Sequence, residues 1–100
     1  MIAYHGGNKP SSKEEGMAQM QKWQEWIESL GDKIINPGTP LPNSKIVTAS
    51  YIEDEISPDR MMGYAIVKAT NMDEATKIAQ TDPFLENEGT IRVFQMMELT

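Results

Sequence analysis

The only histidine of the chain closes its first apolar run. Residues 1–7 read MIAYHGG, so His5 follows four largely apolar residues and precedes two glycines. An imidazole titrates near neutral pH and acts as a general base when a carboxylate orients it. We expect Asp82 to supply that carboxylate, because it lies at a helix end beside Pro83. The competing interpretation makes His5 a partly exposed strand-end residue and Asp82 the cap of its own turn.

Several other side chains suit a small-molecule pocket between a helix and a sheet. Arg60 could hold a carboxylate through two parallel hydrogen bonds, although its acidic neighbours make an ion pair the alternative. The hydroxyl of Tyr64 could face a ligand, with packing in a core or interface as the alternative. The expected ligand is a small aromatic or carboxylic acid, held near His5 by Tyr4, Trp23, Asn36, Arg60, Tyr64 and Phe94.

Net charge limits the classes of partner. The chain has fifteen acidic and nine basic residues, which gives a formal charge of −6. Affinity for nucleic acid comes mainly from Lys and Arg side chains that neutralise phosphates, so we expect no nucleic-acid partner. An anionic membrane surface is disfavoured for the same reason, and no apolar run approaches the roughly 20 residues of a membrane span.

Residue types also limit the chemistry. The chain has no cysteine and one histidine, which excludes disulfides and thiolate nucleophiles and argues against a zinc site. The sequence holds neither a phosphate-binding loop nor a nucleophile elbow, so we expect no cofactor and no metal. A chain without cysteine or a visible signal peptide is expected to be cytoplasmic.

A helix over residues 12–30 should position Trp23. Ser12 and Glu15 have the spacing of a capping box, and Gly31 follows as the residue that ends the helix. Apolar residues three or four positions apart form one buried stripe, with Trp26 beside it: Met17, Met20, Trp23, Ile27 and Leu30.

The remaining elements complete a single domain of 100 residues. A second helix starts at Asn71, again with a glutamate three residues later, and ends before Pro83. If the short strand 33–36 continues into its successor, the order becomes βαββαβ, an α+β, ferredoxin-like arrangement. The predicted strands are residues 1–5, 33–36, 45–52, 63–69 and 90–99.

Two helices can cover only one face of such a sheet. Yet the strand 63–69 has apolar residues on both of its faces, and the strand 90–99 is similar. An uncovered apolar face marks an interaction surface. We therefore expect a homodimer in which the sheet faces of two copies pack together.

Several stretches resemble proteins of the YCII-related family, especially its DGPF-type branch and the shorter YciI-type members. The resemblance covers nearly the whole chain and implies a dimeric α/β barrel built from two ferredoxin-like subunits. The stretches that carry it are QKWQEWI (21–27), LG (30–31), PGTPL (37–41), GYAIVKATNMDEA (63–75), DPF (82–84) and TIRVFQMMEL (90–99).

The resemblance implies little chemistry, because most members have no assigned activity. Some are thought to use a histidine–aspartate pair, and one relative looks like a dehydrochlorinase of a chlorinated aromatic. This chain departs from the family in having no histidine in its first helix and EISPDR (55–60) where the Asp-Gly-Pro-Phe motif would lie. Two functions stay open: a small-molecule-binding or enzymatic homodimer, and a non-catalytic interaction or regulatory module.

Overall fold

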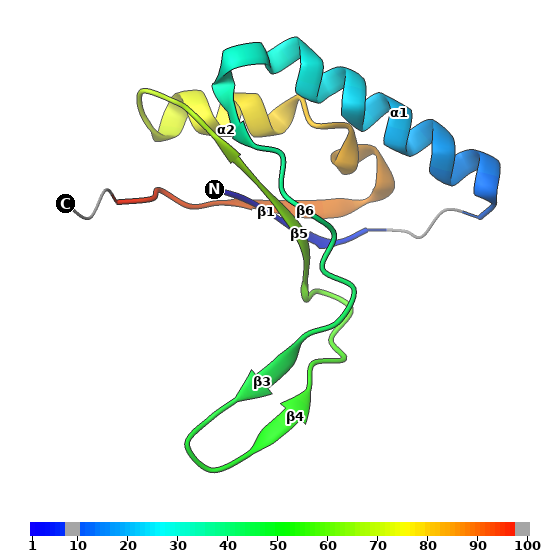
Figure 1. Ribbon diagram of the computed structural model, residues 1–100, viewed down its shortest axis with the longest axis vertical. Coiled ribbons are helices and arrows are strands. Elements are labelled where there is room, and N and C mark those ends of the chain that lie inside the picture. Colours follow the sequence, from blue (N-terminus) through cyan, green and yellow to red (C-terminus); the bar gives the residue numbers. More distant parts are fainter. Residues whose placement is uncertain (8–10, 98–100) are drawn as a thin grey trace.

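The computed structural model describes residues 1–7 and 11–97 of the chain, and Figure 1 shows their arrangement. Two short 3₁₀ turns, η1 (Gly31–Lys33) and η2 (Pro83–Asn87), follow the two helices. The elements in chain order are β1 (Ile2–Gly6), α1 (Lys13–Leu30), β2 (Ile34–Asn36), β3 (Lys45–Val47), β4 (Ile52–Asp54), β5 (Met61–Val67), α2 (Met72–Gln80) and β6 (Gly89–Val93).

The main sheet has the strand order β2-β5-β1-β6, and every neighbouring pair is antiparallel. With α1 after β1 and α2 after β5, this is the ferredoxin-like topology that the sequence predicts. Side chains of both helices pack with Ile2, Tyr4 and Ala65 in one core, so both helices cover the same face. Residues 1–7 and 11–97 place no second layer on the opposite face, and the molecule is 18 Å thick along its shortest axis.

Both helices begin at the predicted capping residues. The Ser12 side chain accepts a hydrogen bond from the Glu15 backbone N–H at 3.1 Å, and Asn71 Oδ1 accepts from the Glu74 N–H at 2.8 Å. The Glu15 carboxylate accepts from the Ser11 N–H, at 3.1 Å, so it reaches the residue before the cap. These bonds satisfy amides that the first helical turn leaves without partners.

Trp26, which the predicted stripe leaves at its flank, is the most buried residue of α1. Its indole N–H donates to Thr81 Oγ1 at 2.8 Å, at the end of α2, and its side chain is 7% exposed. Met17 and Met20, predicted to be buried, are 65% and 51% exposed. The reason is the length of α2, which lies beside the C-terminal half of α1 and leaves the first turns of α1 without cover (Figure 1).

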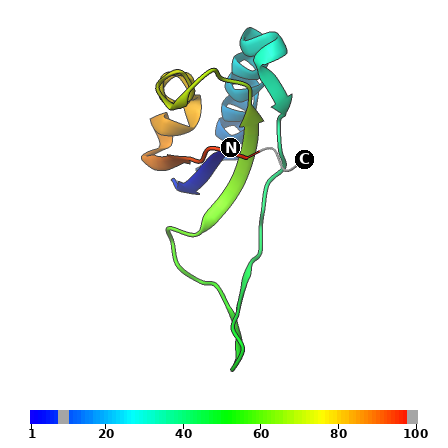
Figure 2. The ribbon, with the colours of Figure 1, turned by 90° about the vertical axis from the view of Figure 1, so that its left-hand side faces the viewer.

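The predicted strand 45–52 is only partly confirmed, because β3 covers Lys45–Val47, Ile52 begins β4, and neither strand joins the main sheet. These residues form a separate hairpin instead, in which β3 pairs with β4 through Lys45–Asp54 and Val47–Ile52, around a turn closed by Thr48 and Tyr51. The preceding segment carries three prolines, Pro37, Pro40 and Pro42, which cannot donate hydrogen bonds to a sheet. The hairpin therefore projects away from the body of the molecule (Figures 1 and 2).

The last strand is shorter than predicted. β6 ends at Val93, after which the Phe94 N–H donates to the Met1 carbonyl at 2.8 Å and the Met1 amino group donates back to the Phe94 carbonyl at 2.6 Å. Residues 98 and 99 of the prediction lie outside the described part of the chain.

Candidate functional site

A cavity of about 480 Å³ lies between α1 and the helix-covered face of the sheet. Its volume falls in the range of roughly 300–1,000 Å³ that is typical of small-molecule sites. Segments from across the chain enclose it: α1, the loop 37–40, the start of β5 and η2. Its lining includes Tyr4, Gln19, Met20, Lys22, Trp23, Pro37, Gly38, Thr39, Pro40, Met62, Tyr64, Pro83, Phe84, Glu86 and Asn87.

Tyr4 and Asp82 form the buried polar pair of this cavity. The Tyr4 hydroxyl, carried by β1, donates to Asp82 Oδ2 at 2.5 Å, and Asp82 is 2% exposed. The other carboxylate oxygen, Asp82 Oδ1, accepts from the Phe84 N–H at 2.9 Å and so caps η2, whose first residue is Pro83. The predicted capping role of Asp82 is confirmed, and it coexists with the contact to Tyr4.

Burial shifts the titration of both partners. Desolvation raises the pKa of Asp82 above its ordinary value, although the hydrogen bonds from Tyr4 and Phe84 act in the opposite direction. Burial, and then the neighbouring Asp82 carboxylate, raise the pKa of the Tyr4 hydroxyl far above its usual range. Tyr4 therefore keeps its proton, and the pair shares a hydrogen bond in a site with little water.

Aromatic rings form the walls around this pair. The ring centroids of Tyr4 and Phe84 lie 4.9 Å apart at an interplanar angle of 54°, and the indole Nε1 of Trp23 lies 3.5 Å from Tyr4 Oη. The Phe84 ring lies against Gly89, where an added Cβ would come within 2.2 Å of Cε2. Gly89 thus makes room for the Phe84 ring in the cavity wall. This role of Gly89 was not among those predicted from the sequence.

The loop 37–40 forms the wall opposite η2. Gly38 has a φ of 77°, and a Cβ at this position would lie 1.7 Å from the carbonyl oxygen of Tyr64. Asn36 Oδ1 accepts from the Gly38 N–H at 2.8 Å and so fixes the turn. Only glycine allows this loop to lie so close to β5.

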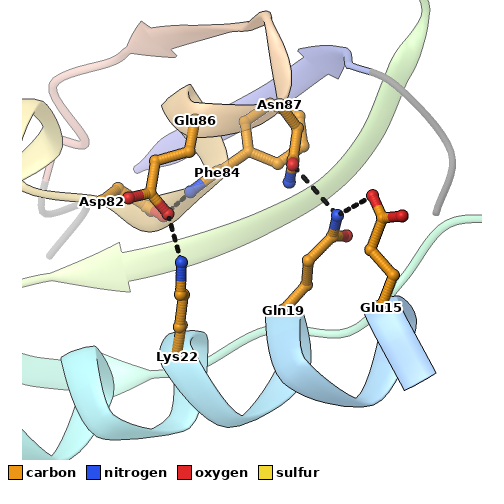
Figure 3. Close-up of polar contacts among 7 residues, drawn as sticks. All are labelled: Glu15, Gln19, Lys22, Asp82, Phe84, Glu86 and Asn87. Carbon is orange, nitrogen blue, oxygen red and sulfur yellow. Dashed lines mark hydrogen bonds and ion pairs between the residues drawn. The ribbon is translucent and has the colours of Figure 1, made fainter.

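Polar contacts between α1 and η2 cross the rim of the cavity (Figure 3). Lys22 Nζ pairs with Glu86 Oε2 at 3.4 Å, and the Gln19 amide donates to Asn87 Oδ1 at 3.0 Å and to Glu15 Oε1 at 3.3 Å. The side chains of the ion pair are 60% and 62% exposed, so it contributes little to stability. The pair holds the Lys22 ammonium group against Glu86 at the rim of the cavity, away from the aromatic side chains.

Three of the predicted ligand residues, Tyr4, Trp23 and Tyr64, line the cavity. Asn36 shapes the adjoining turn, and Phe94 does not line the cavity but lies 47% exposed after β6, so Phe84 takes the place expected for Phe94. Phe84 follows the Asp82-Pro83 turn, and Phe94 lies in the predicted strand 90–99. The sequence alone does not show which of the two rings lines the cavity.

Arg60 does not make the expected ion pair. Its guanidinium donates to the carbonyl oxygens of Leu41 at 2.9 Å and Pro42 at 2.7 Å, which ties the start of β5 to the root of the hairpin. The prolines explain this use of arginine, because a segment poor in N–H donors still exposes carbonyl acceptors. Arg60 lies outside the cavity lining.

His5 does not meet Asp82. Successive residues of a strand point to opposite faces, so His5 lies on the open face while its neighbour Tyr4 contacts Asp82. Its Nδ1 donates to the carbonyl oxygen of Asp59 at 2.9 Å. Within the described residues, Nε2 is buried and has no hydrogen-bond partner. The expected His5–Asp82 hydrogen bond is therefore wrong.

Residues 1–7 and 11–97, which the structure describes, contain no group of three or more His, Cys, Asp or Glu residues placed to hold a metal ion. No helix within them has the length and apolar content needed to cross a bilayer.

No protein-family model and no curated protein matches this chain. Among solved structures, it is similar to the 5-chloro-2-hydroxyhydroquinone dehydrochlorinase of Burkholderia phenoliruptrix AC1100, determined in complex with 2,5-dihydroxybenzoquinone. The TM-score is 0.52 and the sequences are 17% identical, over 94% of this chain and 92% of the other. This likeness supports the ferredoxin-like α+β fold, and membership of the YCII-related family stays a prediction.

Proposed function

We propose that this protein binds a small aromatic molecule in the cavity between α1 and the sheet. The observation that carries the proposal is the cavity itself, whose aromatic lining includes Tyr4, the residue that donates to the buried Asp82 carboxylate. Ligand sites in proteins commonly combine apolar walls with a few fixed polar groups that orient the ligand.

The shape of the cavity favours a planar ring. Tyr4, Trp23 and Phe84 offer ring faces and edges, which attract aromatic ligands through stacked and edge-to-face contacts. The similar dehydrochlorinase holds 2,5-dihydroxybenzoquinone, a ring of the size class that a cavity of about 480 Å³ accommodates. Its fold is similar to that of this chain, which makes its ligand a reasonable first probe.

Within this proposal, Asp82 is the candidate acid–base residue and acts through Tyr4. Tyr4 lines the cavity, whereas Asp82 lies outside the lining and accepts from the Tyr4 hydroxyl at 2.5 Å. A proton that moves between a ligand and Asp82 would therefore pass through the Tyr4 hydroxyl. His5, on the other face of the sheet, has no part in this chemistry.

The proposal includes a homodimer. The open sheet face carries Tyr64 and Ile66, which are half-buried, and nearby Ile35 and Phe94 are 63% and 47% exposed. A second copy packed on this face would remove these side chains from water, and apolar burial stabilises by about 25 cal/mol per Å². The absence of cysteine fits a reducing compartment, so we expect the dimer to act in the cytoplasm.

Nuclear magnetic resonance of the two tryptophan indoles tests ligand binding directly. Trp23 lines the cavity, whereas the indole of Trp26 is engaged with Thr81, so the two N–H signals form a site reporter and an internal control. Trp23→Phe and Trp26→Phe assign the two signals. Titration with 2,5-dihydroxybenzoquinone or hydroquinone should shift the Trp23 signal and leave Trp26 in place. Equal movement of both signals, or no movement at millimolar ligand, would contradict the proposal.

The alternative is a non-catalytic interaction module, and the β3–β4 hairpin favours it. Val47 and Ile52 form a cross-strand pair on one face of the hairpin, 70% and 68% exposed, and Ile56 nearby is 89% exposed. An isolated two-stranded hairpin is marginally stable in water, so a second copy of the chain could both cover and order it.

Sedimentation of two matched variants separates these interfaces. Ile66→Lys places a charge on the open sheet face, and Val47→Lys places the same charge on the hairpin. Dissociation by Ile66→Lys alone supports the sheet-to-sheet homodimer, whereas dissociation by Val47→Lys alone supports the hairpin. A wild-type monomer at micromolar concentration would contradict both.

A further inference from the structure

We infer that the cavity selects aromatic ligands carrying a hydroxyl group, and that Tyr4 Oη is the atom that makes this selection. The inference rests on the proposed function, whose ligand class it narrows from small aromatic molecules to phenols and hydroquinones. It follows from the hydrogen-bonding capacity that Tyr4 and Trp23 have left after their contacts within the protein.

The single proton of the Tyr4 hydroxyl is already engaged. It is donated to Asp82 Oδ2 at 2.5 Å, and Asp82 Oδ1 accepts the Phe84 N–H at 2.9 Å. Two hydrogen bonds into one carboxylate stabilise its ionised form, which requires Tyr4 to be the donor. A phenol oxygen retains acceptor capacity after donating its proton. Tyr4 therefore presents an acceptor to the cavity, and the ligand must donate to it.

Trp23 adds a donor beside this acceptor. Its indole Nε1 can only donate, and it lies 3.5 Å from Tyr4 Oη, at the long limit of a hydrogen bond. A ligand oxygen placed between the two could accept from Trp23 and donate to Tyr4. A hydroxyl does both, whereas an ether, a carbonyl or a carboxylate oxygen only accepts.

Charge disfavours a carboxylate ligand at the same point. Its negative charge would lie close to buried Asp82, and like charges repel strongly where water is excluded. The cation that lines the cavity, Lys22, pairs with Glu86 at the rim. A neutral phenol avoids this repulsion and keeps both hydrogen bonds.

The test compares matched ligands in which none, one or both of the hydroxyl protons are replaced by methyl groups. Hydroquinone, 4-methoxyphenol and 1,4-dimethoxybenzene are titrated against the Trp23 indole signal, with benzoate as the anionic comparison. We expect 1,4-dimethoxybenzene to bind roughly 10-fold more weakly than hydroquinone, because a lone acceptor would face the acceptor Tyr4 Oη. Benzoate should bind more weakly than either phenol.

Variants assign the selection to Tyr4. Tyr4→Phe should bring the affinities of hydroquinone and 1,4-dimethoxybenzene together, whereas Tyr51→Phe, at an exposed tyrosine of the hairpin outside the cavity lining, should leave their ratio unchanged. Because Tyr4 is buried, circular dichroism must first establish that Tyr4→Phe is folded. Asp82→Asn is the second variant: its amide can donate to Tyr4 and free the Tyr4 proton, which should reduce the ratio.

The outcomes separate the two proposals. No binding of any aromatic ligand contradicts the proposed function itself. Binding of hydroquinone and its dimethyl ether with equal affinity, or tighter binding of the ether, overturns the hydroxyl selection while leaving aromatic binding intact. A ratio that survives in Tyr4→Phe and in Asp82→Asn overturns the role of Tyr4.

Discussion

The Tyr4 hydroxyl and the Asp82 carboxylate, 78 positions apart in the chain, meet at 2.5 Å inside the protein. β1 supplies the first residue and the cap of η2 supplies the second, so the contact forms only when both ends of the chain have folded. The pair also gives the cavity its only buried carboxylate among the described residues.

The stability contributed by Asp82 should depend on pH. Burial raises its pKa in the folded protein above the ordinary value of 3.8, so the folded state keeps this proton to higher pH than the unfolded chain does. Its contribution is fully present below the unfolded pKa and is lost as pH rises through the folded pKa. The free energy of unfolding of wild type, minus that of Asp82→Asn, should therefore fall as pH rises from below 3.8 through the folded pKa of Asp82. Urea unfolding at several pH values measures it, and a rising difference would reverse the sign.

Trp26 should matter more for stability than Trp23. Trp26 is 7% exposed and hydrogen-bonded to Thr81, so Trp26→Ala removes both core packing and a partner of the Thr81 hydroxyl. We expect a loss of about 3–5 kcal/mol in the free energy of unfolding. Trp23→Ala, at the cavity wall, should cost less, and Met17→Ala, with the side chain 65% exposed, should cost little. Chemical denaturation of the three variants ranks them, and equal losses would refute this account of the core.

Gly89→Ala should damage the cavity as well as the fold. The new Cβ would lie 2.2 Å from the Phe84 ring, which must then move away from Tyr4. Gly31→Ala is the matched control, because its φ of 53° strains alanine while nothing lies within 4 Å of the new Cβ. Both variants should lower the melting temperature, but only Gly89→Ala should shift the Trp23 indole signal. A Trp23 signal unchanged in Gly89→Ala would show that the ring does not shape the cavity.

Arg60→Lys should loosen the root of the hairpin. A single ammonium cannot reproduce the separate hydrogen bonds that the guanidinium makes to the Leu41 and Pro42 carbonyls. The Leu41 amide, which donates to the Met62 carbonyl at 2.9 Å, should then exchange with deuterium faster. Arg92→Lys, an exposed position on β6, is the control. Protection of the Leu41 amide that is equal in both variants would argue against the clamp.

Local patterns predict the local structure of this chain well. The capping residues Ser12 and Asn71 mark both helix starts, and the order of the elements leads to the ferredoxin-like sheet. The β-branched run after Lys45 also predicts a strand, and part of it is one. Its partner could not be read from the pattern, because a hairpin and a sheet edge require the same residue types.

The candidate site was only partly predictable for a similar reason. Tyr4 and Trp23 lie on regular elements whose faces follow from periodicity, and both line the cavity. Tyr64 also belongs to the lining, although strand alternation places its side chain on the face opposite Tyr4. Phe84 lies in a 3₁₀ turn, where no periodicity assigns a direction to the ring. The alternation of β1 does imply that His5 and Tyr4 face opposite sides, so a contact of Asp82 with one of them excludes a contact with the other.

The hairpin makes the chain a practical scaffold. Hydrogen bonds of residues 44–55 run among these residues themselves, as in Ser44–Glu55, Lys45–Asp54 and Thr48–Tyr51. Its tip points away from the helices and the main sheet in both views of the ribbon (Figures 1 and 2). Exposed loop tips are the sites where proteins best tolerate insertions. An affinity tag or a fluorescent label placed between Thr48 and Tyr51 would allow this protein to be captured or detected without contact with the cavity.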